Sequence, residues 1–276
     1  MGEWSFKALG TQWWLESPQP LANQAEILAV VRQFENDYSR FNPSSLLSQL
    51  NDKHELLSPP PEMQAMLQYG LDMYSQTGGV FNMSVGAQLE KTGYGRVAPV
   101  GARVSENLLQ DVQLTPQKIT LAPHVRLDFG GFGKGWLVDK LAAMVDGPVI
   151  VNGGGDIYVK GPMQSLLIEH PLTSGQAIGS VAVGDESLCS SSRQKRVWRD
   201  AKGQEQSHIP GQSNLLSVHV RAESALVADT LGTVFLLVER PKRLELAAQF
   251  NAEFLEITKD LDFWQTPGFG LEPFRN

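Results

Sequence analysis

The chain is poor in cysteine, in basic residues and in long apolar runs. Cys189 is the only cysteine among 276 residues, so an internal disulfide and a cysteine-rich zinc site are both excluded. Lysine and arginine total 23 against 30 acidic residues, and the formal net charge is −7. Proteins that bind nucleic acid irrespective of its sequence are usually basic, so we expect no nucleic-acid partner. No run of about 18 apolar residues occurs, so we expect no membrane span.

The N-terminus also lacks an export signal. Residues 1–14 contain no basic segment followed by an apolar segment. The single cysteine fits a reducing compartment. We therefore expect a cytoplasmic protein, with a periplasmic protein whose leader has been removed as the alternative.

What is present is an ordinary globular composition, 42% hydrophobic and 19% charged, which is enough to bury a core. Hydrophobic periodicity predicts helices over residues 22–38, 45–51, 62–76, 136–145 and 225–238. It predicts strands over residues 4–15 (interrupted at Gly10-Thr11), 118–121, 125–129, 148–151, 165–169, 177–183, 186–189 and 215–220. Gly203 suggests a hairpin turn. Helices combined with antiparallel hairpins predict an α+β fold of antiparallel sheets with packed helices, as a single domain over residues 1–276.

The stretch over residues 125–156 carries the main candidate for a binding site. The predicted strand at 125–129 leads into Gly130-Gly131-Phe132-Gly133-Lys134-Gly135, and a helix pattern follows from Trp136. Glycines let a backbone approach a ligand closely, and a helix N-terminus offers free N–H groups that favour phosphate. The stretch therefore predicts a phosphate-binding loop, with a tight turn that binds nothing as the alternative.

Two common phosphate motifs do not fit this loop. A Walker A loop needs Ser or Thr after its lysine, and here Gly135 follows Lys134. A dinucleotide fingerprint needs a third glycine where Trp136 stands. The order strand, loop, helix, strand, leading to Asp156, still resembles a dinucleotide-binding βαβ unit. A nicotinamide-dependent oxidoreductase therefore stays open as a further reading.

Asp229 and Thr233 form a second candidate feature. They are four residues apart in the predicted helix over 225–238, so both side chains lie on one helix face. A carboxylate and a hydroxyl are oxygen ligands of the type that Mg²⁺ prefers. A purely structural pair is the alternative for these two residues taken alone.

Seven segments, in order along the chain, are similar to the motifs of one family. They are Ala8–Thr11 (ALGT), Ser39–Asn51 (SRFNPSSLLSQLN), Gly78–Gly86 (GGVFNMSVG), Leu127–Asp139 (LDFGGFGKGWLVD), Asn152–Asp156 (NGGGD), Ile168–Pro171 (IEHP) and Ala228–Thr233 (ADTLGT). Together they resemble the FAD:protein FMN transferases, the ApbE family, whose fold is T-fold-related.

The resemblance implies a Mg²⁺-dependent enzyme that uses FAD as substrate. Such an enzyme cleaves FAD, attaches FMN to a Thr or Ser of a target flavoprotein and releases AMP. An FAD pyrophosphatase and a non-catalytic FAD-binding protein are alternatives within the same resemblance.

The resemblance also assigns residues. It implies that Asp229, Thr233 and the carbonyl of Gly133 hold Mg²⁺, and that His208 and Lys134 are catalytic, although a lone histidine near a turn is often structural. The cofactor-binding residues that it implies are Leu9, Phe81, Asn82, Gly131, Trp136, Asp139, Glu169, Ser191 and Ile209.

The chain departs from the family pattern at several positions. After His208-Ile209 the family has D-P-x-T-G, whereas this chain has PGQSN over residues 210–214. Asn82 stands where the family has Asp, and Phe41 where it has Tyr. The altered segment after Ile209 is the feature that favours a non-catalytic FAD-binding protein.

Overall fold

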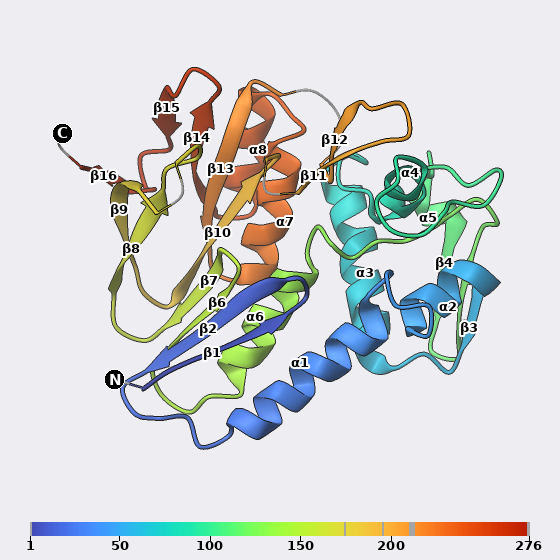
Figure 1. The fold of residues 1–276 in the computed structure, drawn as a ribbon, viewed down its shortest axis with the longest axis horizontal. Coiled ribbons are helices and arrows are strands. Elements are labelled where there is room, and N and C mark those ends of the chain that lie inside the picture. Colours follow the sequence, from blue (N-terminus) through green and yellow to red (C-terminus); the bar gives the residue numbers. More distant parts are fainter. Residues whose placement is uncertain (1, 174, 195, 210–212, 275–276) are drawn as a thin grey trace. The chain divides into compact units, whose positions relative to one another are not determined.

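The computed structural model describes residues 2–173, 175–194, 196–209 and 213–274 (Figure 1). The chain divides into two units. The first comprises residues 1–31, 132–195 and 211–276, and the second comprises residues 32–131 and 196–210. Helix α1 (Gln24–Tyr38) begins in the first unit and ends in the second. The organisation as a single domain stays a prediction.

The first unit is built on an eight-stranded antiparallel sheet in the order β1-β2-β6-β7-β10-β13-β14-β15. The strands are Gly2–Ala8 (β1), Thr11–Ser17 (β2), Val149–Gly153 (β6), Asp156–Lys160 (β7), Glu186–Ser192 (β10), Leu215–Ala222 (β13), Glu253–Thr258 (β14) and Phe263–Gln265 (β15). The predicted strand at 186–189 continues through the serines to Ser192.

The two faces of this sheet are covered differently. A three-stranded sheet of β8 (Gln164–Glu169), β9 (Ala177–Val183) and β16 (Glu272–Pro273) packs against one face. The shared core includes Leu188 of β10 and Ile168 of β8. On the other face, Cys189 of β10 contacts the carbonyl of Ala225, because successive strand residues point to opposite faces.

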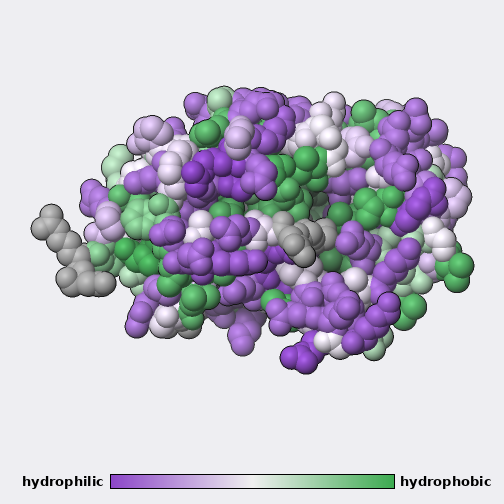
Figure 2. All heavy atoms as spheres, turned by 90° about the horizontal axis from the view of Figure 1, so that it is seen from above, coloured by the Kyte–Doolittle hydropathy of each residue, from purple (hydrophilic) through white to green (hydrophobic). Residues whose placement is uncertain are grey.

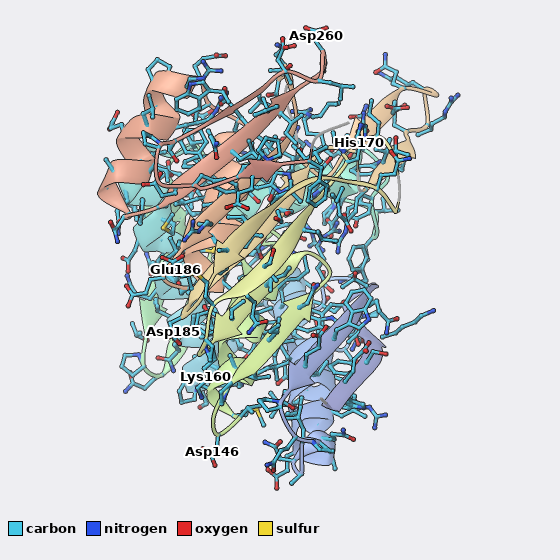
Figure 3. The ribbon with its side chains drawn as sticks, turned by 90° about the vertical axis from the view of Figure 1, so that its left-hand side faces the viewer. Asp146, Lys160, His170, Asp185, Glu186 and Asp260 are labelled. Carbon is cyan, nitrogen blue, oxygen red and sulfur yellow. The ribbon has the colours of Figure 1, made fainter. Side chains whose placement is uncertain are left out.

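Helices α6 (Gly133–Ala143) and α7 (Ala225–Phe235) therefore lie on the face opposite the small sheet, and α8 (Arg240–Gln249) follows α7. Ser224 caps α7, because its hydroxyl accepts a hydrogen bond from the amide of Val227. At the C-terminus of α6, Lys160, which Figure 3 labels, donates to the carbonyls of Val145 at 2.6 Å and Ala142 at 3.3 Å. A cation at a helix C-terminus stabilises it.

The second unit combines helices with a three-stranded antiparallel sheet in the order β3-β5-β4 and a separate hairpin, β11–β12. Its elements after α1 are α2 (Leu46–Lys53), β3 (Glu55–Leu57), α3 (Pro61–Gln76), the 3₁₀ helix η1 (Met83–Val85), α4 (Gly86–Lys91), α5 (Leu108–Asp111), β4 (Val112–Thr115), β5 (Lys118–Leu121), β11 (Val197–Arg199) and β12 (Glu205–Ser207). The hairpin turn at Gly203 is confirmed.

The strand predicted over residues 125–129 is wrong, since this segment joins no sheet. The side chain of Asn51 bonds to both backbone groups of Leu127, accepting from its N–H at 2.7 Å and donating to its carbonyl at 2.9 Å. An amide side chain thus takes the place that a neighbouring strand would occupy. Since residues 122–132, which lead into the helix, contain no strand and β6 pairs only antiparallel with β2 and β7, the βαβ reading is wrong as well.

None of the helices within the described residues combines the length and the apolar character needed to span a bilayer. Figure 2 shows hydrophilic and hydrophobic residues interspersed over the face that it presents. The fold class predicted above, antiparallel sheets with packed helices, is confirmed.

Candidate functional site

The glycine loop ends in the helix α6, which begins at Gly133, three residues before the predicted start at Trp136. The first amides of a helix have no partner within it. One of them, the N–H of Gly135, donates to Oδ2 of Asp229 on α7 at 3.0 Å. The two segments that carry the predicted loop and the predicted metal pair therefore meet in the first unit.

Gly135 allows this meeting because it has no side chain. A Cβ at this position would lie 2.3 Å from the carbonyl oxygen of Ala225 and 2.9 Å from Cβ of Asp229. Both neighbours belong to α7 and cannot easily shift. The close approach of α6 to α7 thus explains the second glycine of the Gly-Lys-Gly sequence.

We expect Gly135→Ala to lower the free energy of unfolding by about 1–3 kcal/mol, because the added methyl group overpacks the α6–α7 contact. Chemical denaturation measures the change. Gly70→Ala in α3 is the matched control: there the three atoms nearest to the added Cβ all belong to the Met83 side chain, with Sδ at 2.5 Å, and alanine favours the helix. Equal losses in the two variants would contradict the assigned role of Gly135.

Lys134 lies between two carboxylates. Its ammonium forms an ion pair with Asp156 at the start of β7, and Nζ is 3.7 Å from Oδ1 of Asp229. The side chains of both aspartates are almost completely buried, whereas that of Lys134 is 20% exposed. Burial lowers the pKa of Lys134, but the charges of Asp156 and Asp229 outweigh this effect and raise the pKa above its ordinary value. The ammonium therefore stays charged.

Asp156 is the residue that the sequence reading left out of the site. Its motif, NGGGD, is visible in the sequence, but its link to Lys134, 22 residues earlier, is not. The link depends on strand register, since Asp156 opens β7 and pairs with Cys189 of β10. An acidic residue directly after a glycine turn was the available signal.

Asp139, predicted to bind the cofactor, also has a structural contact. Its two carboxylate oxygens accept hydrogen bonds from the first amides of α7, Ala225 at 2.8 Å and Leu226 at 2.9 Å. Burial raises the pKa of Asp139, and these two hydrogen bonds offset only part of the rise. The contact fixes the start of α7 against α6, and a direct role toward the cofactor stays a prediction.

Thr233 lies one turn after Asp229 on α7 and is half-buried. Between them Gly232 packs against Ser191 of β10, since a Cβ at Gly232 would lie 2.6 Å from the Ser191 hydroxyl oxygen. Ser191, another predicted cofactor residue, therefore belongs to the same neighbourhood as the Asp229–Thr233 pair.

Two turns lie close together at one end of the large sheet. The β1–β2 turn places Leu9 and Gly10 at φ of 51° and 72°, the positive values that a two-residue type I′ turn requires. Leucine is unusual in this conformation, and such strain is often found at functional sites. The turn packs on the NGGGD turn, where a Cβ at Gly154 would lie 2.4 Å from Oγ1 of Thr11. The carbonyl of Gly155 accepts a hydrogen bond from the amide of Ser190 at 3.0 Å.

Cys189 of β10 pairs with Asp156 and is completely buried. Burial raises the pKa of its thiol well above the ordinary value, and the charges of Asp156 and Asp229 add to the rise. We expect a disulfide reagent at pH 8 to label Cys189 at least about 100-fold more slowly in the native protein than in the unfolded one. Comparable rates in the two states would contradict the burial of this thiol.

Two further residues of the first unit, Trp136 and Glu169, were predicted to bind the cofactor. Trp136 is half-buried in the first turn of α6. Glu169 is exposed at the end of β8, in the small sheet that packs on the opposite face from α6 and α7. The structure therefore does not bring Glu169 to the Lys134 cluster. Its role, like that of Trp136, stays a prediction.

The second unit contains the remaining predicted residues. Phe81 is buried, and Asn82 accepts hydrogen bonds from the amide and hydroxyl of Ser84 at 3.0 and 2.6 Å. Ile209 is buried. Gly131 is half-buried and is the last residue of the glycine loop that belongs to this unit. These residues stay predicted cofactor contacts.

His208 follows the β11–β12 hairpin and is half-buried. Its Nδ1 lies 3.4 Å from the carbonyl of Arg196. Because a carbonyl can only accept a hydrogen bond, this contact favours a proton on Nδ1. The segment that departs from the family pattern begins at Pro210, and residues 210–212 lie outside the described residues.

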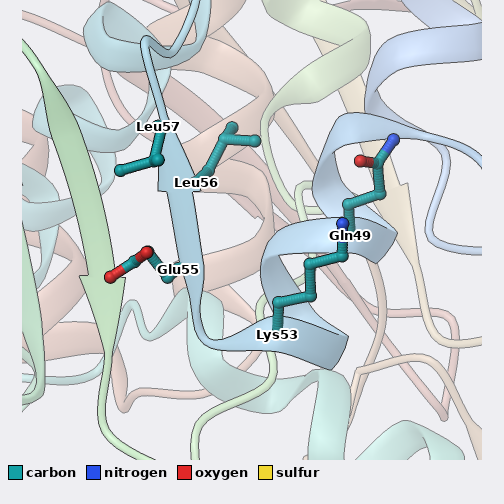
Figure 4. A pocket seen from close by; sticks show the side chains of 5 residues that line it. All are labelled: Gln49, Lys53, Glu55, Leu56 and Leu57. Carbon is teal, nitrogen blue, oxygen red and sulfur yellow. The ribbon is translucent and has the colours of Figure 1, made fainter.

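An open pocket between α2 and β3 is lined by Gln49, Lys53, Glu55, Leu56 and Leu57 (Figure 4). None of the predicted site residues lines it. We therefore assign the candidate site to the start of α6 and not to this pocket.

The donor atoms around α7 fit Mg²⁺ by type. Over the described residues, no group of three or more His, Cys, Asp or Glu side chains is placed to hold a metal ion. Mg²⁺ needs no such group, because it binds through one or two carboxylates and takes its other ligands from water and phosphate. The carboxylate of Asp229 is nearly buried, and its Oδ1 lies beyond hydrogen-bonding distance of Lys134. This oxygen, the Thr233 hydroxyl and a backbone carbonyl are hard ligands of the required kind.

The architecture and the site together define an α+β protein in which a lysine and two buried carboxylates gather at the start of a helix after a glycine loop. The chain belongs to the ApbE family, whose model matches residues 8–255.

Named relatives and solved structures agree with this assignment. The FAD:protein FMN transferase of Haemophilus influenzae is 25% identical over 274 residues, covering 86% of this chain and 79% of that protein. That of Escherichia coli K12 is 24% identical, covering 95% of this chain and 86% of that protein. The ApbE protein of Thermotoga maritima has the same fold, with a TM-score of 0.84 at 20% identity and 97% of both chains covered. The flavin transferase ApbE of Vibrio cholerae gives 0.76 at 19% identity, with 97% of both chains covered.

Proposed function

We propose that this chain is a Mg²⁺-dependent FAD:protein FMN transferase that uses FAD as substrate and a target flavoprotein as acceptor. The observation that carries the proposal is the contact between the start of α6 and Asp229 of α7, with Lys134 beside it. A helix start and a lysine favour a phosphate group, and a buried carboxylate favours a metal ion. Membership of the ApbE family and the names of its relatives support the same activity.

The proposed reaction transfers the FMN part of FAD. The hydroxyl oxygen of a Thr or Ser in the target attacks the phosphorus atom on the FMN side of the pyrophosphate. The bond from this phosphorus to the bridging oxygen breaks, and AMP leaves with that oxygen. The acceptor hydroxyl loses its proton, and we assign its removal to His208. When bound, Mg²⁺ would neutralise negative charge on the pyrophosphate.

The chain's own groups supply positioning. Asp229 and Thr233 would hold the metal ion, with the carbonyl of Gly133 as a further proposed ligand. The ammonium of Lys134 and the positive end of the α6 helix dipole would face the phosphates. Phosphoryl transfer depends mainly on such positioning and charge neutralisation, which is why a compact polar cluster suffices. Reaction in the cytoplasm stays a prediction.

The test incubates the purified protein with FAD, Mg²⁺ and a candidate target flavoprotein, and reads the products by mass spectrometry. The transferase predicts a target heavier by one FMN and an equal amount of AMP. Free FMN and AMP with an unmodified target would identify an FAD pyrophosphatase. FAD that binds but stays intact would identify a non-catalytic FAD-binding protein.

A further inference from the structure

The Lys134 ammonium is a competitor for the metal ion. It stands 3.7 Å from Oδ1 of Asp229, the oxygen that the Gly135 amide leaves available. A lysine side chain is flexible, so a small rotation would bring the ammonium into hydrogen-bonding contact with this oxygen. A cation seated there would repel Mg²⁺ and occupy its ligand. Something must therefore hold the ammonium away from Asp229.

Asp156 is placed to do so. Its carboxylate forms the closer ion pair with Lys134, and its side chain is only 1% exposed. Its backbone is fixed, because β7 is paired on both sides, with β6 and with β10, and Asp156 itself faces Cys189. The preceding Gly154 and Gly155 have φ of 73° and 99°, so the glycine turn delivers Asp156 to this position.

Asp229 is equally fixed on the other side. Its Oδ2 accepts a hydrogen bond from the Gly135 amide, and the lack of a side chain at Gly135 lets α6 pack closely against α7. Of the three charged side chains in this cluster, that of Lys134 has the most rotatable bonds, and its position depends on which carboxylate attracts it more. Two carboxylates and one ammonium leave one negative charge for a metal ion.

We propose that Asp156 is a positioning residue that draws the Lys134 ammonium away from Asp229 and so keeps Oδ1 of Asp229 available to the divalent cation. The inference rests on the proposed function, because it assumes that Asp229 holds the metal. It gives the last residue of the NGGGD segment a role that does not require contact with the substrate.

The test measures metal affinity without turnover. Mn²⁺ serves as the probe, and the free ion is counted by electron paramagnetic resonance in the presence of FAD and the absence of any target. We expect Asp156→Asn to weaken Mn²⁺ binding by about tenfold, because Lys134 moves onto Asp229. Loss of a nearby negative charge alone would also weaken binding, so a second comparison is needed.

The comparison is a double-mutant cycle with Lys134→Met. If Asp156 acts through Lys134, Asp156→Asn weakens binding at least about fivefold less in the Lys134→Met background than in the wild type. Equal effects in both backgrounds would overturn the proposal. If Asp156→Asn alone folds too poorly to be measured, Lys134→Met is compared with the double variant, and a loss of affinity of about tenfold between these two would overturn the proposal.

A crystal structure of Asp156→Asn gives an independent readout. The Nζ–Oδ1 distance between Lys134 and Asp229 should shorten from 3.7 Å to a hydrogen bond of about 2.8–3.0 Å. An unmoved ammonium would overturn the proposal. Wild-type protein that binds no Mn²⁺ would instead reject the metal site of the proposed function, and this inference with it. Mn²⁺ binding that survives in Asp229→Ala would do the same.

Discussion

Replacing Asp229 by asparagine should abolish detectable Mn²⁺ binding and lower the rate of FMN transfer by about 100- to 1000-fold, the cost of losing one charge-stabilising group in a phosphoryl-transfer site. Asparagine has nearly the same shape, and its carbonyl oxygen can still accept the hydrogen bond from Gly135. Lys134 keeps its partner Asp156. The substitution therefore removes the metal-binding charge while leaving the α6–α7 contact in place.

The matched control is Asp146→Asn, which removes the same charge from an exposed position of the first unit (Figure 3). Its transfer rate and its Mn²⁺ affinity should stay close to those of the wild type. Rates are measured from AMP release under single-turnover conditions, and thermal unfolding checks that both variants are folded. Transfer at an undiminished rate in Asp229→Asn would show that the metal ion is held elsewhere.

Replacing Arg126 by methionine should lower the free energy of unfolding by about 3–5 kcal/mol, because it leaves a buried carboxylate without its counter-charge. The Arg126 guanidinium donates to Glu90 at 2.5 and 3.3 Å and to the carbonyl of Asn51 at 3.1 Å. The Glu90 side chain is 1% exposed. Urea denaturation followed by circular dichroism measures the loss.

Two controls test the reason for this loss. The double variant Arg126→Met with Glu90→Leu removes both charges, and it should recover much of the lost stability. Lys118→Met breaks an ion pair with Glu55 in which both side chains are more than 40% exposed, and it should cost less than about 1 kcal/mol. A loss in Lys118→Met as large as that in Arg126→Met would contradict the attribution to burial.

The comparison of pattern with structure is clearest at Leu127. Alternation of apolar and polar residues predicted a strand there, yet the partner of its backbone is the side chain of Asn51, 76 residues earlier. Periodicity reports which side chains are buried, and a buried extended segment has the same pattern whether its backbone pairs with a strand or with an amide side chain. The sequence therefore suggested a dinucleotide-binding unit, and the structure excludes it because the first strand of that unit is absent.

The helices were predicted well where a cap or a clear apolar face marks them. Ser45 accepts a hydrogen bond from Ser48 at 3.0 Å and starts α2 where the sequence placed it. The start of α6 was placed three residues late, because Gly133 and Gly135 are poor helix formers. Their places in the helix are decided by contacts with α7, which local propensity does not contain.

The sequence by itself determined the α+β class, the family and the candidate residues at the start of α6 and on α7, because these follow from local periodicity and from the order of short motifs. Only the tertiary structure decided that Lys134 pairs with Asp156 and that Asp139 anchors α7. Ion pairs and helix contacts between residues far apart in the chain depend on strand register and on close packing. These are set by the whole fold, so no single stretch of sequence encodes them.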